Sequence, residues 1–485
     1  MLNRFYATSH LILMMFIATT CWADLDVQGP YLGQPSPGLE TQIFAPGIIS
    51  TRGNTDGRPV WTPDGLELYY FSSGSGTYTQ GKDGFWTEPR PLSIQAGIPP
   101  MFMTVGLGFA GPRFSGDGQR AYVTDGHGVW MSERTDTGWS EARNLNIPEH
   151  NFELWWFSVT NDGTLYMTMG REATSTYYIY RARPDENGEY PTLENMNNTI
   201  GARNSFYNHI SLDESILILT QWNVSGGYGD EDLYISFRDE QDNWTHPRNL
   251  GPKINTSGTE WSPFLTADGK YLFYNSQRAA YNSPIDMLWI EARAVLPDPN
   301  GPFENTNTGQ RFGSIQLAID NTNDGEVIVL QPGIYNENVN LGSKNIKLQS
   351  VDPNNPSYIG GTIIQGSPDD PVITLQYNSE ACEIAGLTIR AGLSGIAGTS
   401  TDVTIRNCRI MDNVNHGLEL ARRSEPHLLN CLIAGNGQAG IMNLANPGRG
   451  SSFSAPLIEN CVIVQNGSAN IDGGQPIIVD SIVSQ

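Results

Sequence analysis

Three stretches near the end of the chain share one pattern: Asn407-Cys-Arg-Ile-Met-Asp-Asn413, Asn430-Cys-Leu-Ile-Ala-Gly-Asn436 and Asn460-Cys-Val-Ile-Val-Gln-Asn466. They begin 23 and 30 residues apart, and Gly386-Leu-Thr-Ile389 has the same shape 21 residues before the first. Such a repeat predicts a solenoid, in which each unit is one coil and equivalent residues stack on the neighbouring coil. Alternation places Cys and Ile inside. The Asn at each bend can adopt unusual backbone angles and hydrogen-bond to the next coil, which predicts an asparagine ladder.

The region that contains these repeats, residues 310–485, resembles the right-handed parallel β-helix of the pectin-lyase fold. The resemblance includes its opening: Ser314 precedes a helical segment, Asp324-Gly325 ends it, and Gln331-Pro-Gly-Ile-Tyr335 follows a buried-type strand. It implies an exported protein that binds or cuts acidic polysaccharides. Residues 480–485 fit the next repeat but stop where its second Asn would fall, so we expect the chain to be a fragment, truncated at its C-terminus.

Residues 24–295 carry a different repeat, an Asp-Gly turn between an apolar approach and a strand rich in aromatic residues. The turns occur at Asp64, Asp117, Asp162, Asp213 and Asp268, which are 53, 45, 51 and 55 residues apart. Glu214 replaces the Gly in the fourth copy. Each turn predicts a hairpin of two half-buried strands, and two further strand patterns follow in most units. Four strands in about 50 residues are typical of a β-propeller blade.

The fifth unit stops after its third strand near Val295, and the missing strand has a counterpart in residues 41–46. Pairing of this segment with the last blade would close the ring and leave no unpaired edge strand. We therefore expect five blades, with six as the alternative if residues 93–110 hold another. These motifs, over residues 40–295, resemble the TolB-like, WD-like β-propeller repeat. The resemblance implies a platform for binding proteins or glycans, although some relatives are lyases or peptidase modules.

Residues 296–309 are rich in Pro, Asn and Gly and are interpreted as a domain linker. The predicted fold class is therefore all-β, a propeller followed by a right-handed parallel β-helix. The composition agrees, because charged residues make up only 16% and there are 52 Gly and 30 Pro. The formal charge of −23 disfavours a nucleic-acid partner or an anionic membrane surface.

The first 23 residues have the pattern of a secretory signal peptide. Arg4 precedes an apolar run from Leu11 to Ala18, and small residues follow up to Ala23. The apolar run is shorter than the roughly 20 residues that span a bilayer. We expect cleavage near Ala23, no membrane span, and a secreted or periplasmic protein.

Four cysteines remain in the mature chain: Cys382, Cys408, Cys431 and Cys461. Adjacent coils lie close enough for disulfides. Three of the four nevertheless occupy one inward column beside Ile, where Cys behaves as a small hydrophobic residue, so a reduced, packed ladder is the favoured interpretation. No spacing indicates a zinc or redox site.

Candidate chemistry on the β-helix is confined to basic residues. Glycoside hydrolysis needs two carboxylates about 5 to 10 Å apart, and the outward positions of the repeats supply no such pair. A lyase needs a cation for the uronate carboxylate and a base for the neighbouring proton. Six basic residues lie within two coils: Arg406, Arg409, Arg422, Arg423, His416 and His427. Solvated arginines on a loop are the simpler interpretation, and ligand binding or catalysis is the alternative.

No cofactor is expected. Asp230, Glu231 and Asp232 could bind calcium, but a solvated acidic turn is the favoured interpretation. The propeller histidines, His127, His150, His209 and His246, show no ligand spacing. The sequence therefore predicts an exported binding or surface-interaction protein for polysaccharide or protein ligands. The alternative is a polysaccharide lyase or glycoside hydrolase that acts on acidic glycans through the β-helix.

Overall fold

The computed structural model describes most of the chain. The described residues are 24–25, 27–51, 55–73, 75–82, 84–91, 111–136, 138–148, 152–171, 176–201, 205–239, 241–278, 285–298, 300–444 and 454–484. The predicted signal peptide, its cleavage near Ala23, His150 and the segment 93–110 that the six-blade alternative requires lie outside them. None of the helices in the described part has the length and apolar character needed to cross a bilayer. The chain divides into two compact units, with the boundary at Ile290 and Glu291 and with residues 38–40 assigned to the second unit.

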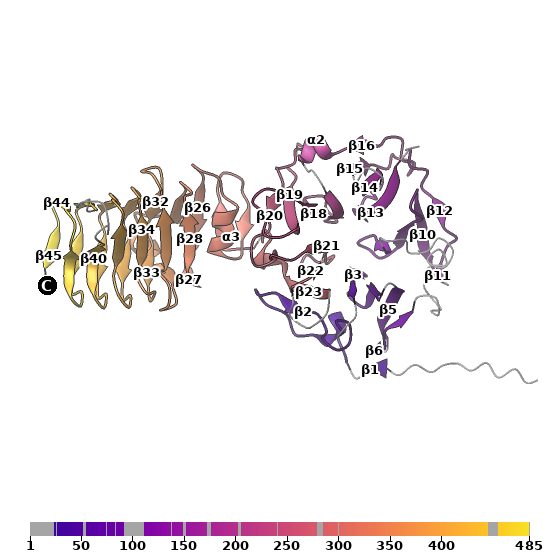
Figure 1. Ribbon diagram of the computed structural model, residues 1–485, viewed down its shortest axis with the longest axis horizontal. Coiled ribbons are helices and arrows are strands. Elements are labelled where there is room, and N and C mark those ends of the chain that lie inside the picture. Colours follow the sequence, from indigo (N-terminus) through magenta and orange to yellow (C-terminus); the bar gives the residue numbers. More distant parts are fainter. Residues whose placement is uncertain are drawn as a thin grey trace, which may run out of the picture. The chain divides into compact units, whose positions relative to one another are not determined.

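The described residues of the first unit form five consecutive antiparallel sheets (Figure 1). Blade 1 comprises β3 (Asp56–Trp61), β4 (Glu67–Ser72), β5 (Ser75–Lys82), β6 (Phe85–Thr87) and β7 (Arg90–Pro91), with β1 (Asp24–Leu25) paired to β6. Blade 2 comprises β8 (Arg113–Phe114), β9 (Arg120–Thr124), β10 (Val129–Thr135), β11 (Gly138–Trp139) and β12 (Arg143–Asn144). Blade 3 comprises β13 (Glu153–Val159), β14 (Leu165–Arg171), β15 (Thr176–Ala182) and β16 (Glu194–Asn195).

Blade 4 comprises β17 (Ser205–Ile210), β18 (Ile216–Trp222), β19 (Glu231–Phe237) and β20 (Arg248–Asn249). Blade 5 comprises β21 (Glu260–Leu265), β22 (Tyr271–Ser276), β23 (Asp286–Glu291) and, from the N-terminal part of the chain, β2 (Gln42–Ile43). Gln42 pairs with Trp289 and Ile43 with Leu288, so an early segment supplies the outer strand of the last blade. This closure and the five-bladed arrangement confirm the prediction. Short helices η1 (Tyr31–Gly33) and α2 (Asn197–Ile200) lie outside the blades.

The recurring aspartate explains the hairpins of the blades. In blade 1 the Thr62 hydroxyl donates to Asp64 Oδ1 at 2.6 Å, and the same oxygen accepts the Leu66 backbone N–H at 3.0 Å. Gly65 follows with a φ of +67°, which glycine adopts without steric cost. Equivalent Ser/Thr-to-Asp hydrogen bonds occur in the other four turns, at Ser115, Thr160, Ser211 and Thr266. The aspartate thus holds each turn closed.

The second unit is a solenoid of three parallel sheets (Figure 1). Sheet 1 contains β26 (Val327–Leu330), β29 (Lys347–Ser350), β32 (Glu383–Ala385), β35 (Thr404–Arg406), β38 (His427–Leu429), β41 (Leu457–Glu459) and β44 (Ile477–Val479). Sheet 2 contains β27 (Gly333–Asn336), β30 (Thr362–Gln365), β33 (Thr388–Arg390), β36 (Arg409–Met411), β39 (Leu432–Ala434), β42 (Val462–Val464) and β45 (Ile482–Ser484). Sheet 3 contains β28 (Val339–Gly342), β31 (Ile373–Gln376), β34 (Ile396–Thr399), β37 (Leu418–Ala421), β40 (Ala439–Asn443) and β43 (Ala469–Asp472). This arrangement confirms the predicted parallel β-helix.

The solenoid begins earlier than the sequence indicates. Two short strands, β24 (Phe303–Asn305) and β25 (Arg311–Phe312), pair antiparallel and extend sheet 1 at β26. Phe303 is buried in the solenoid core, and the centroid of its ring lies 4.6 Å from that of Tyr335. The stretch 296–309, expected to be a linker, therefore contributes a strand to the second unit. The described residues of this unit also include three helices: η4 (Ala292–Ala294), α3 (Ile315–Asp320) and α4 (Pro356–Gly361).

The repeated Asn and Cys residues occupy the predicted places. The four cysteines are buried and free of disulfides, and they line the solenoid core. The bend residues Asn407, Asn430 and Asn460 have φ between +51° and +55°, and Asn430 donates its amide to Asn407 Oδ1 at 3.1 Å. A second ladder is buried: Asn413 donates to Asn436 Oδ1, and Asn436 donates to Asn466 Oδ1, each at 2.9 Å. The buried asparagine side chains of successive coils are therefore hydrogen-bonded to one another.

Candidate ligand-binding site

The six basic residues predicted from the sequence do not converge on one site. Arg406 and His427 lie on sheet 1, whereas Arg409 is the first residue of β36 on sheet 2. His416 precedes β37 of sheet 3, and Arg422 with Arg423 follow the same strand. The residues are close in sequence, but the chain bends between them onto different sheets.

On sheet 1 the predicted residues are engaged with carboxylates. Arg406 Nε lies 2.6 Å from Glu383 Oε1, and Lys347 Nζ lies 3.6 Å from the other oxygen of the same carboxylate. His427 Nε2 lies 3.2 Å from Glu459 Oε2. The outward face of sheet 1 is therefore a row of paired charges, and such pairs leave little net potential for a ligand.

On sheet 3 the predicted residues are in two different environments. His416 is buried, and its Nδ1 accepts the backbone N–H of Ala439 at 3.2 Å. Because its ring is buried and bonds to the backbone of the next coil, His416 is a structural residue of the solenoid. Arg422 and Arg423 are exposed at the following bend, where both have positive φ.

Sheet 2 carries a cationic pair without acidic partners. Arg390 ends β33 after the buried Ile389, and Arg409 begins β36 before the buried Ile410, so the two outward arginines lie diagonally across neighbouring strands. Arg390 Nε donates to Gln365 Oε1 at 3.2 Å, and Gln365 donates in turn to Asn336 Oδ1 at 3.2 Å. Neither arginine forms an ion pair with any described residue. In a chain of net charge −23, these two guanidiniums form an uncompensated positive patch.

Sequence reasoning found Arg409 but missed Arg390. Thr388-Ile389-Arg390 occupies the same place in its coil as Arg409-Ile410-Met411 in the next, as the strand register shows. Alignment of the early, degenerate repeat with the later ones was the signal that could have found it. Asn336 and Gln365 belong to coils without the Asn-Cys motif, so no motif marked them.

The carboxylates of sheet 1 are too far apart for glycoside hydrolysis. Glu383 on β32 and Glu459 on β41 are separated by the two strands β35 and β38. Three strand spacings of about 4.8 Å place them roughly 14 Å apart, beyond the 5 to 10 Å that the reaction uses.

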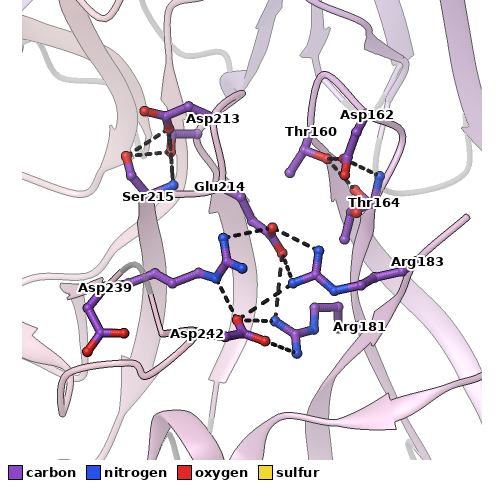
Figure 2. Close-up of polar contacts among 12 residues, drawn as sticks. Thr160, Asp162, Thr164, Arg181, Arg183, Asp213, Glu214, Ser215, Asp239 and Asp242 are labelled. Atoms are coloured by element: carbon purple, nitrogen blue, oxygen red, sulfur yellow. Dashed lines mark hydrogen bonds and ion pairs between the residues drawn. The ribbon is translucent and has the colours of Figure 1, made fainter.

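The first unit contains an ion cluster between blades 3 and 4 (Figure 2). Its centre is Glu214, the residue that replaces Gly in the fourth turn. The Glu214 carboxylate accepts hydrogen bonds from Tyr166 Oη at 2.8 Å and from Arg183 at 2.9 Å. Arg238 lies 3.0 Å from it, and Asp242 pairs with Arg181 at 2.8 Å. Arg181 also pairs with Glu194, so three arginines face three carboxylates. A neutral, mutually satisfied cluster of this kind joins blades rather than binding a ligand.

The acidic run at residues 230–232 also forms a structural turn. Asp232 is buried and accepts the backbone N–H of Tyr228 at 2.7 Å and the Asn249 amide at 3.0 Å. Burial raises the pKa of Glu231. Across the ranges given above, no three His, Cys, Asp or Glu residues are grouped so that they could hold a metal ion.

A family model described as "Right handed beta helix region" matches residues 357–484. A protein from Agrobacterium tumefaciens described as TolB is 14% identical, with 47% of this chain and 72% of that chain covered and a TM-score of 0.31. A protein from Lactobacillus plantarum is 15% identical, with 43% and 59% covered and a TM-score of 0.25.

A third solved structure is a pectin methylesterase mutant in complex with a hexasaccharide. It is 14% identical, with 36% of this chain and 76% of that chain covered and a TM-score of 0.21. No curated protein matches the chain. The strand topology shows a five-bladed propeller followed by a parallel β-helix, and the family match identifies residues 357–484 as a right-handed β-helix region. Similarities at these identities and TM-scores carry no argument about activity.

Proposed function

We propose that this protein binds an acidic polysaccharide along the outward face of sheet 2. The observation that carries the proposal is the pair Arg390 and Arg409, two guanidiniums on adjacent coils with no acidic partner among the described residues. Guanidinium groups bind carboxylates in bidentate geometry, and a uronate carboxylate supplies that group.

The neighbouring side chains suit a sugar chain. Asn336 and Gln365 continue the row from Arg390 and offer amide groups to hydroxyls. Ile363 and Met411 are half-buried outward residues on the same two columns, and they offer apolar contact to the C–H faces of sugar rings. Parallel strands repeat every 4.8 Å or so, which presents these groups as a linear array.

The same face supports binding better than cleavage. Its outward positions on β27, β30, β33 and β36 hold Ile, Asn, Gln, Thr, Arg and Met, none of which is a general base at neutral pH. A lyase needs such a base beside the cation. We therefore favour a binding protein over a polysaccharide lyase or hydrolase, and we place it outside the cytoplasm because residues 1–23 have a signal-peptide pattern.

Binding to polygalacturonate tests the proposal, measured by isothermal titration calorimetry. Each charge-assisted contact contributes about 1.5 to 3 kcal/mol, so Arg390→Gln combined with Arg409→Gln should weaken binding about 100-fold or more. The matched control is Arg422→Asn with Arg423→Asn, which removes the same charge and keeps residues that tolerate positive φ. Absence of binding by the unmodified protein, or loss of binding in the control alone, would refute the proposal.

A further inference from the structure

The propeller contains a polar groove between blade 4 and α2, the helix that joins blades 3 and 4, and this groove takes no part in the function proposed above. Its volume is about 620 Å³, within the range of roughly 300 to 1,000 Å³ that is usual for small-molecule sites. The polar residues that line it are Asn197, Asn198, Gln221, Asn223, Tyr234 and His246. No Asp, Glu, Lys or Arg lines it in the described part of the chain.

The backbone positions two of these amides. Asn197 opens α2, and its Oδ1 accepts the Ile179 N–H at 2.8 Å, which fixes the side chain and leaves its NH₂ group as a donor. Asn223 follows β18 with a φ of +54°, a conformation that asparagine tolerates. The side chains of Asn198 and Asn223 have no hydrogen-bond partner among the residues described. The groove therefore presents both amide donors and amide acceptors.

Two rings complete the groove. A Cβ atom at Gly201 would lie 3.0 Å from the His246 ring, so glycine at this position allows the imidazole to pack directly against the end of α2. Tyr234 is buried on β19 and contributes the other ring. Rings beside amides offer a ligand both apolar contact and hydrogen bonds.

We propose that this groove binds a neutral saccharide of one to three sugar units. Side-chain amides pair with vicinal hydroxyls, which both donate and accept, and the His246 and Tyr234 rings contact the C–H faces of the sugar. An ionic ligand would find no counter-charge in the lining and, if anionic, would be repelled by the net charge of the chain. The site is independent of the arginine pair on sheet 2.

The test uses the full chain with maltotriose, cellotriose, mannotriose and galactotriose, and with trigalacturonate as the charged comparison. Saturation-transfer difference NMR identifies binding, and calorimetry measures its affinity. At least one neutral trisaccharide should bind, with an affinity that changes less than about twofold between roughly 50 and 500 mM NaCl because no charges are paired. Arg390→Gln with Arg409→Gln should leave this binding unchanged.

Substitutions in the groove test whether the saccharide binds there. Asn198→Ala with Asn223→Gly should weaken binding about tenfold or more, because two amide contacts are lost while the helix and the positive φ are accommodated. Gln241→Ala, an exposed amide of blade 4 outside the groove, is the control and should bind as the unmodified protein does. Failure of all four neutral sugars to bind, binding untouched by the groove variant, or preference for trigalacturonate at this groove would each overturn the proposal. Thermal unfolding of the groove variant checks that it remains folded.

Discussion

The variant Glu214→Gly sets two opposing effects against each other at the ion cluster between blades 3 and 4. It restores the Asp-Gly pair of the other four propeller turns and removes the carboxylate at the centre of the cluster. The backbone φ of Glu214 is +62°, where a residue with a Cβ atom is strained by roughly 1 to 2 kcal/mol. Glycine relieves this strain at an entropic cost of about 0.5 to 1 kcal/mol, so glycine by itself should favour the folded protein by up to about 1 kcal/mol.

The lost contacts outweigh that gain. The Glu214 side chain is only 8% exposed, and its carboxylate contacts Tyr166, Arg183 and Arg238 at 2.8 to 3.0 Å. Removal of one partner from a buried ion pair costs about 3 to 5 kcal/mol. Arg183 is 36% exposed and partly screened by water, which lowers the cost. We therefore expect a net destabilisation of about 2 kcal/mol.

Urea denaturation, followed by tryptophan fluorescence, measures this change in the free energy of unfolding. Hydrogen exchange in β14, β17 and β18 assigns the change to the propeller. Glu214→Gln is the matched variant, because it keeps the side-chain size and the backbone angle and removes only the charge. A Glu214→Gly protein that is as stable as the unmodified protein, or more stable, would refute the reasoning. In that case the relief of backbone strain in the turn would contribute at least as much free energy as the lost contacts of the ion cluster.

Three further predictions follow from buried or paired groups. Hydrogen bonds from Arg181 hold the pKa of Asp242 at about 2. The stability that this carboxylate contributes should therefore be present above about pH 4 and lost as the pH falls towards 2. In the Asp242→Asn variant, the free energy of unfolding, measured as a function of pH, should fall less over this range. Burial raises the pKa of Cys382 to about 12, so peptide mapping after iodoacetamide treatment near pH 8 should find this thiol unmodified in the native protein and alkylated after denaturation. Asn436→Ala removes the acceptor of both the side-chain amide and the backbone N–H of Asn413, and one of two donors to Asn466 Oδ1. It should destabilise the β-helix by about 3 kcal/mol, measured by urea denaturation, whereas Asn430→Gly at an exposed bend should cost less than about 1 kcal/mol.

Much of the fold could be predicted because residues within each repeat determine the backbone conformation of its own turn or bend. The turn aspartates cap their own backbone, as Asp64 does, and the bend asparagines accept positive φ, as Asn407 does. The strand Phe303–Asn305 could not be predicted, because three residues in a stretch rich in Pro, Asn and Gly show no periodicity. Its position depends on burial of Phe303 beside Tyr335, a contact between residues 32 apart.

The candidate site was harder to predict than the fold. Arg406 and Arg409 are three residues apart, but the bend at Asn407 puts them on different sheets. Arg406 forms an ion pair with Glu383 of the preceding coil, whereas Arg409 forms no ion pair with a carboxylate among the described residues. Whether the charge of an arginine is paired with a carboxylate depends on the register between coils, and the local sequence does not show that register.

Footprinting of the unmodified protein with polygalacturonate tests the central claim most directly. Hydroxyl-radical labelling with and without the polysaccharide should show protection at Ile363 and Met411, beside the two arginines, with no change at Leu429 and Leu457 on sheet 1. Protection on sheet 1, or on the propeller alone, would contradict the assignment of the acidic-polysaccharide site to Arg390 and Arg409.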